Sequence, residues 1–157
     1  MVLKEMMTAE DISKILNNYN LNDNTVSIIG CPQHLYKTLL NEKYNIKSYI
    51  CYNNYHWFSI VFLREQNLVI TMDSLGSKLN YEYRKKILEF DKKINFFYFS
   101  NSVQTDGISC GLFAIVFIFI FFYIYNREAN NILQTLKHVK KKHVLYLFNK
   151  IEKKYFK

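Results

Sequence analysis

The chain has 157 residues, of which 50% are hydrophobic and 22% charged, with a formal net charge of +8 at pH 7. This length and composition allow one sizeable core without disulfides or metal ions, as in a single domain. With 4 Gly and 1 Pro, the sequence has no stretch typical of a flexible linker. It also has no internal repeat, which excludes a tandem-repeat protein. We therefore expect one domain over residues 1–157.

The cysteines indicate a reducing environment. Cys31, Cys51 and Cys110 are an odd number without the dense spacing of a secreted disulfide scaffold, so free thiols are expected. The first residues lack the apolar run and cleavage site of a secretory signal, which indicates action inside a cell. The sequence has no Cys and His spacing typical of zinc sites and no Gly-rich phosphate loop. We expect neither a metal nor a nucleotide cofactor.

Helix and strand patterns alternate along the first part of the chain. Thr8, followed three residues later by Asp11, predicts a capped amphipathic helix over 8–18. Runs rich in β-branched and aromatic residues predict strands, and the three in the middle are separated by short turns, so we expect an antiparallel meander. The remaining expected elements are a strand over 26–29, a helix over 33–41, strands over 46–52, 57–63 and 68–72, a helix over 81–90 and a strand over 94–99.

The last part of the chain is expected to form helices over 110–125 and 133–154. Residues 107–126 carry no charge, and about 18 uncharged, mainly apolar residues are the usual criterion for a membrane span. The strictly hydrophobic stretch 112–125 is short for a span, however, and Gly107 and Ser109 suit a lipid-facing end poorly. A buried central helix is therefore the preferred interpretation, and a membrane span is the alternative.

Cys110 stands where a nucleophilic thiol is expected. It joins a polar loop to the apolar helix, and the positive end of a helix dipole favours a thiolate. Gly111 carries no side chain, which would let a substrate backbone approach closely. A buried inert thiol is the alternative for any single cysteine beside an apolar helix.

Three further residues complete a catalytic pattern with Cys110. His56 begins one expected strand and Asp73 ends the next, and two antiparallel strands joined by a short turn bring the two side chains together. A carboxylate that holds one imidazole nitrogen presents the other nitrogen to a thiol, as in a nucleophile, base and orienter triad. Gln104 lies in the loop before Cys110, where its amide would stabilise a developing oxyanion.

The motifs His56-Trp57, Asp73-Ser74-Leu75-Gly76 and Gln104 six residues before Cys110-Gly111-Leu112-Phe113 resemble those of the cysteine proteases that include the adenovirus maturation protease, adenain, and the SUMO-specific proteases. The resemblance implies a compact papain-like cysteine protease fold of the α+β class, with a central, mostly antiparallel sheet packed against the helix that bears the catalytic cysteine. It also implies that Trp57 roofs a narrow substrate channel, with Gly111 beside it, which favours glycine in the substrate.

Two branches of this family share features with the chain. Ser102-Val103-Gln104 and the C-terminal aromatic residues are similar to the adenovirus branch, whereas the spacing of six and the Asp-Ser-Leu-Gly turn are similar to the SUMO-specific branch. The first implies an endopeptidase that cleaves Gly-containing sites in viral precursor proteins during particle maturation, in the host nucleus or cytoplasm or packaged in the virion. DNA and an activating peptide are its implied partners. The second implies an isopeptidase acting on ubiquitin-like modifiers.

Positive charge is concentrated at the C-terminal end. Residues 126–157 hold nine Lys or Arg against Glu128 and Glu152, so this segment contributes +7. Such a segment attracts the phosphates of nucleic acid, and a solvated helix face is the alternative. A small basic protein that binds nucleic acid or inserts into a membrane, with no catalysis, is therefore the non-enzymatic interpretation. The candidate nucleic-acid-binding residues are Lys137, Lys140, Lys141, Lys142 and Lys150, with His138 and His143 on the same surface.

Overall fold

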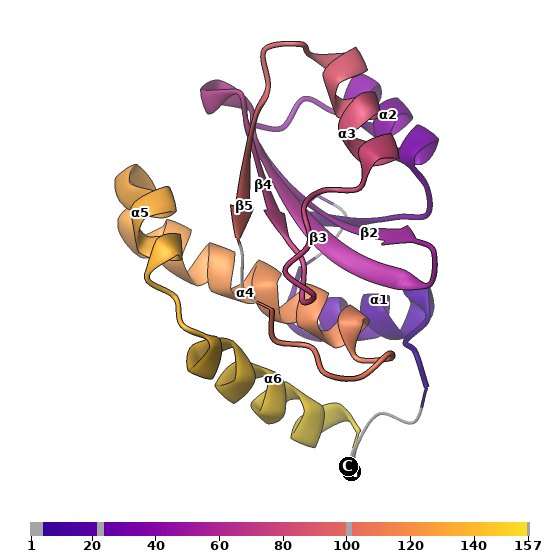
Figure 1. Ribbon diagram of the computed structural model, residues 1–157, viewed down its shortest axis with the longest axis vertical. Coiled ribbons are helices and arrows are strands. Elements are labelled where there is room, and N and C mark those ends of the chain that lie inside the picture. Colours follow the sequence, from indigo (N-terminus) through magenta and orange to yellow (C-terminus); the bar gives the residue numbers. More distant parts are fainter. Residues whose placement is uncertain (1–4, 22–23, 100–101, 157) are drawn as a thin grey trace.

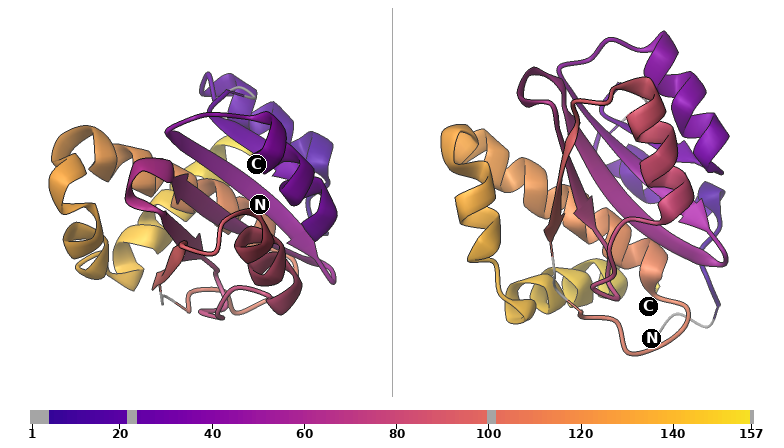
Figure 2. Two further views of the ribbon diagram at one scale, coloured as in Figure 1. Left: turned by 90° about the horizontal axis from the view of Figure 1, so that it is seen from above. Right: turned by 45° about the horizontal axis from the view of Figure 1, so that its top comes forward.

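A five-stranded mixed sheet lies between two layers of helices (Figures 1 and 2). The structure is a computed structural model, and it describes residues 5–21, 24–99 and 102–156. The strands follow one another across the sheet in chain order. They are β1 (Val26–Ile29), β2 (Ile46–Asn53), β3 (His56–Leu63), β4 (Leu68–Met72) and β5 (Asn95–Phe99).

The three central strands form the predicted antiparallel meander. β2 and β3 pair from Asn53 opposite His56, and the two residues between them, Asn54 and Tyr55, have positive φ angles of 49° and 61°. That conformation matches a two-residue hairpin turn, which fits the twist of antiparallel strands. β3 and β4 are joined by a short 3₁₀ turn over Arg64–Gln66. The hairpin turn fixes His56 at the first position of β3.

The two edge strands pair in parallel with their neighbours, so the sheet is mixed. A parallel neighbour needs a crossover connection, which α2 (Pro32–Asn41) supplies between β1 and β2 and α3 (Tyr81–Phe90) supplies between β4 and β5. These two helices pack against each other on one face of the sheet. The α+β class that the motifs implied is confirmed, with parallel pairing at both edges.

Side chains of β3 alternate between two hydrophobic cores, because successive residues of a strand point to opposite faces. Phe58 and Ile60 join the core beneath α2 and α3. Trp57 and Val61 join the larger core on the other face, which contains α1 (Ala9–Asn18) and α4 (Cys110–Glu128). Burial on both faces explains why β3 reads as a continuous hydrophobic run.

The apolar helix α4 (Cys110–Glu128) lies in the larger core, against β3. Every residue from 111 to 118 is buried, and the Ser59 hydroxyl on β3 donates to the Ala114 carbonyl at 2.7 Å. The segment Cys110–Lys137 meets the length and composition criteria for a membrane span, but 61% of its most apolar window is buried inside the protein. This burial favours the core-helix interpretation.

The C-terminal segment contains two helices where the sequence predicted one. The single helix expected over 133–154 is wrong: α5 (Ile132–Lys137) ends in a turn, and α6 (Lys141–Tyr155) runs back along α4 (Figure 1). Both helices pack on α4, so the chain must reverse between them. The His138 and Val139 N–H groups close the turn by bonding carbonyls three residues back. α6 then stacks Phe148 on Phe113, with ring centroids 4.2 Å apart.

Candidate active site

The meander brings His56 and Asp73 together. His56 begins β3, and Asp73 directly follows Met72 at the end of the antiparallel partner β4. Their side chains meet at the same end of the sheet, with His56 Nε2 2.8 Å from Asp73 Oδ1. The backbone N–H of Leu75 donates to the same oxygen at 2.9 Å. The carboxylate that orients His56 is therefore itself fixed by the turn that follows it.

Cys110 lies on the other side of His56. It is the first residue of α4, and its Sγ accepts a hydrogen bond from the Trp57 N–H at 3.3 Å. Trp57 directly follows His56, so this contact holds the sulfur beside the imidazole. The Cys110 side chain also raises the pKa of His56. The described residues thus bring the three candidate triad members into one chain of contacts.

The surroundings of His56 favour its protonated form. Burial alone would lower the pKa of the imidazole, but hydrogen bonds to Asp73 and Cys110, together with the charges of those two groups, raise it to about 9. A net rise means that the contacts to Asp73 and Cys110 outweigh desolvation. His56 is therefore an imidazolium at neutral pH.

The pKa of His56 leads to a prediction on pH dependence. The imidazolium loses its proton as the pH rises through about 9, so we expect kcat/KM to fall along an alkaline limb centred there. In Asp73→Asn the carboxylate charge is gone, so the limb should move down toward the ordinary imidazole value of 6.5. Asp91→Asn, at the end of α3, is the matched control and should leave the limb in place. An identical limb in Asp73→Asn would show that this carboxylate does not set the pKa of His56.

The turn after Asp73 holds the loop that leads to Cys110. The Ser74 carbonyl accepts the N–H groups of Val103 and Gln104 at 2.8 and 3.0 Å, and Leu75 forms a β-bridge with Ser102. Gly76 has a φ of +71°, and a Cβ there would come within 3.2 Å of the Ser102 Cβ. Only glycine fits that conformation and approach without strain. The Asp-Ser-Leu-Gly turn therefore positions both Asp73 and the Gln104 loop.

The Gln104 side chain is held at both ends of its amide. The Ser74 hydroxyl donates to Oε1, and Nε2 donates to the Asp106 carbonyl at 2.7 Å. Its predicted role as an oxyanion donor stays a prediction, and the structure places it in the loop before the nucleophile. Sequence reasoning gave Ser74 no role of its own.

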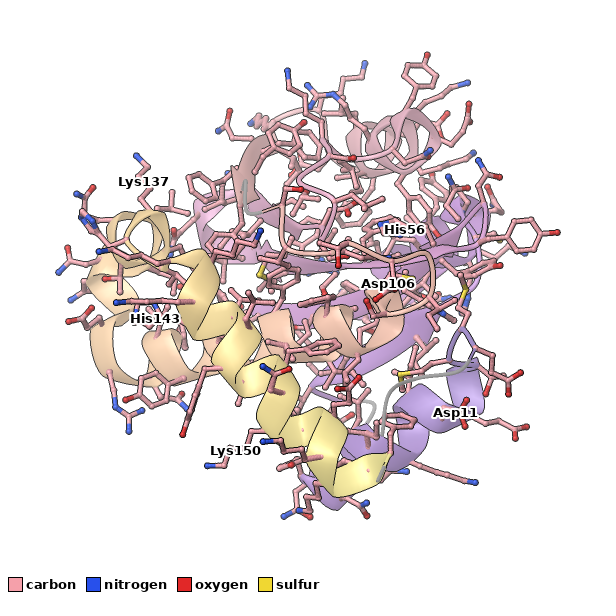
Figure 3. All side chains as sticks on the ribbon, turned by 60° about the horizontal axis from the view of Figure 1, so that its bottom comes forward. Asp11, His56, Asp106, Lys137, His143 and Lys150 are labelled. Atoms are coloured by element: carbon pink, nitrogen blue, oxygen red, sulfur yellow. The ribbon has the colours of Figure 1, made fainter. Side chains whose placement is uncertain are left out.

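Asp106 was also missed by sequence reasoning. Its Oδ1 accepts the N–H groups of Ile108 and Ser109 at 2.8 and 2.7 Å, and its Oδ2 accepts the Ser109 hydroxyl at 2.9 Å. Burial opposes ionisation, but these hydrogen bonds lower the pKa of the carboxyl. Figure 3 shows this residue in the loop that leads to α4. An Asp followed by Gly just before an apolar helix is a readable turn and capping signal.

Trp57 and Gly111 form the wall beside the nucleophile. The Trp57 indole N–H donates to the Met7 carbonyl at 3.0 Å, and the ring lines a concavity of about 640 Å³ next to α1 and Gly30. A Cβ on Gly111 would come within 3.2 Å of Met7 and 3.3 Å of Trp57. Gly111 is therefore needed for packing of the chain on itself, and its predicted contact with substrate stays a prediction.

The candidate nucleic-acid-binding lysines are all exposed. Lys137 ends α5, and the others lie at the start and middle of α6, so they spread over the surface, as Figure 3 shows for Lys137 and Lys150. His143 caps α6 by accepting the Lys140 N–H at 3.1 Å, and His34 likewise accepts from Gly30. Within the described parts of the chain, no group of three or more His, Cys, Asp or Glu is arranged to hold a metal.

Comparisons with known proteins support the fold. No protein family model matches the sequence, and no curated protein matches it. Two solved structures of the ASFV pS273R protease align with TM-scores of 0.52 and 0.54 at 12% identity, over 89% of this chain and 61% of theirs. The structure of HopZ1a in complex with IP6 and CoA aligns with a TM-score of 0.55 at 11% identity, over 83% of this chain and 45% of that one.

A de-sumoylating protease aligns over 91% of this chain and 80% of its own at 15% identity, and its TM-score of 0.46 adds no weight to the comparison. The chain spans 61% of the ASFV protease and 45% of HopZ1a. At these identities the likeness concerns architecture alone. The chain therefore has the α+β fold that it shares with the ASFV pS273R protease and HopZ1a.

Proposed function

We propose that this protein is a cysteine protease in which Cys110 is the nucleophile. The observation that carries the proposal is the contact of Asp73 Oδ1 with His56 Nε2 at 2.8 Å, together with the Cys110 sulfur held at 3.3 Å by the N–H of Trp57, the residue next to His56. The fold supports it, because one of the solved structures that share this architecture is by name a protease. Nothing in this chemistry requires a metal or an organic cofactor.

The contacts suit a two-step acyl transfer. The Cys110 thiolate attacks the scissile carbonyl, and the carbonyl electrons move to oxygen, where the Gln104 amide and the Cys110 N–H would stabilise the oxyanion. His56 then donates its proton to the leaving amine, and the C–N bond breaks to leave a thioester. In the second step His56 takes a proton from water, whose oxygen displaces the thiolate. Asp73 keeps the imidazole oriented throughout.

The site favours substrates with small side chains next to the scissile bond. Cys110 is 1% exposed and Trp57 5% exposed, so only a narrow segment can place its carbonyl next to Sγ. Glycine presents no side chain to the Trp57 wall, and its backbone adopts conformations closed to other residues. We therefore propose cleavage at Gly-containing sites.

Two biological substrates fit this chemistry. By resemblance to the adenovirus enzyme, one is a set of viral precursor proteins cleaved during particle maturation, inside the host cell or the virion. The other is a ubiquitin-like modifier joined to lysine. The six-residue spacing from Gln104 to Cys110 and the turn after Asp73 favour this second substrate.

Hydrolysis of defined substrates separates these functions. The chain is tested on Gly-Gly and Gly-x-Gly peptides and on a ubiquitin-like protein with a C-terminal fluorogenic amide, each with and without duplex DNA. An endopeptidase should cleave the peptides at least as fast as it cleaves the ubiquitin-like protein. An isopeptidase should cleave the ubiquitin-like protein and leave the peptides intact. Acylation by acetyl-CoA without any hydrolysis would reject the protease and point to an acyltransferase.

We also propose that the basic surface on α5 and α6 binds DNA without sequence preference, and that DNA or an added peptide regulates activity. Lys140, Lys141 and Lys142 lie at the N-terminal end of α6, where the helix dipole adds to their charge and favours phosphate. Neutralising phosphates releases counterions, so such binding weakens steeply with salt.

Substitution of these lysines tests the DNA interaction. Replacing Lys140, Lys141 and Lys142 together by Gln should reduce the slope of log K against log salt by up to about three. Peptide cleavage without DNA should stay unchanged. The matched control replaces the exposed Lys85, Lys92 and Lys93, in and after α3, and should keep the parental slope despite the same loss of charge. Equal slopes for both triple variants would show that the α6 lysines are an ordinary solvated surface.

A further inference from the structure

Ser74 connects the residue that orients His56 to the loop that carries Gln104. It directly follows Asp73, and only 1% of it is exposed. Its hydroxyl donates to Gln104 Oε1, while its carbonyl accepts the N–H groups of Val103 and Gln104. One buried residue thus contacts both the backbone and the side chain of the candidate oxyanion donor.

The two hydrogen bonds of the Gln104 amide fix which end faces which partner. A backbone carbonyl only accepts, so the amide atom 2.7 Å from the Asp106 oxygen must be the NH₂ nitrogen. The opposite atom is then Oε1, and the Ser74 hydroxyl must donate to it. The nitrogen carries two hydrogens, of which one meets Asp106 and the other can meet an oxyanion.

We propose that Ser74 is a positioning residue that holds the Gln104 amide with its N–H end toward the developing oxyanion. The inference rests on the proposed protease function, because the amide has this task only if Cys110 attacks a carbonyl. Preorganised donors stabilise an oxyanion without having to reorient during the reaction. Without the Ser74 hydroxyl, Oε1 loses its donor, and the side chain regains freedom to rotate away.

A double-mutant cycle tests whether Ser74 acts through Gln104. Ser74→Ala should lower kcat on a Gly-Gly peptide by about 10- to 100-fold, with KM changed by less than about twofold. In the Gln104→Ala background the same substitution should cost nothing further, since the group it positions is gone. Equal losses in both backgrounds would overturn the proposal, and so would normal turnover by Ser74→Ala.

The matched control for this cycle is Ser48→Ala. Ser48 is a fully buried serine on β2, and within the described residues its hydroxyl has no hydrogen-bond partner. Its removal should leave kcat and KM unchanged. If Ser74→Ala fails to fold, Ser74→Cys keeps the shape of the side chain with a somewhat larger and weaker donor, and the same coupling to Gln104 is expected with a smaller loss of kcat.

Nuclear magnetic resonance tests the positioning without any turnover. In ¹⁵N-labelled protein the Gln104 NH₂ pair is assigned by its absence in Gln104→Ala. We expect two dispersed resonances in the parent, and a shift in Ser74→Ala or Ser74→Cys toward the positions of solvent-exposed glutamines. Unchanged resonances in both variants would contradict the role of Ser74. If the parent protein cleaves no peptide but the Gln104 resonances still shift in the Ser74 variants, the positioning role of Ser74 would be confirmed and only the protease function rejected.

Discussion

Cys110→Ala is expected to lower kcat/KM on Gly-containing peptides by more than about 10⁴-fold, because no other described group can form the acyl-enzyme. His56→Ala should cause a comparable loss, since the leaving amine then lacks its proton donor and the attacking water its general base. The fold should remain intact in both variants, as measured by circular dichroism and thermal unfolding. Asp73→Ala should keep more activity than either, because it orients the base and takes no proton.

The other two cysteines supply the control. Cys31 is exposed at the start of α2 and Cys51 is buried in β2, where burial raises the pKa of its thiol. Cys31→Ala should leave activity unchanged. Normal turnover by Cys110→Ala would contradict the assignment of Cys110 as the nucleophile. An equal loss of activity in Cys31→Ala and Cys110→Ala would contradict it as well.

Gln104→Ala should lower kcat by about 10² to 10³-fold while KM changes little, which is the usual effect of deleting one oxyanion-hole donor. The reason is that the amide meets the substrate oxygen fully only when that oxygen is charged. Gln134→Ala, on α5, is the matched control for loss of a glutamine side chain and should have no effect. A rise in KM at constant kcat would instead make Gln104 a substrate-binding residue.

Local patterns in the sequence predicted that the candidate site residues lie together, and their catalytic roles stay predictions. His56 and Asp73 were placed together because two strands joined by a short turn must be antiparallel, and the structure brings their side chains to 2.8 Å. Cys110 was placed by the switch from a polar loop to an apolar helix. Each of these inferences needs only local periodicity and the geometry of a hairpin.

Long-range packing accounts for most of what the sequence did not reveal. β1 pairs in parallel with β2, and β5 pairs in parallel with β4. These pairings depend on crossovers through α2 and α3, which no strand pattern in the sequence specifies. The turn between α5 and α6 lacks Gly and Pro, so helical periodicity continued across it. The contact of Met7 with Trp57 joins residues 50 positions apart, and such pairs leave no signal in a single sequence.

Covalent trapping of the nucleophile tests the central claim most directly. A Gly-Gly peptide with a C-terminal vinyl sulfone is incubated with the chain at neutral pH, and the modified residue is identified by mass spectrometry. We expect one adduct, on Cys110, formed at least about 10²-fold more slowly in His56→Ala because the thiolate is no longer paired. Modification of the exposed Cys31 in place of Cys110, or a rate unaffected by loss of His56, would contradict a catalytic thiol at the start of α4.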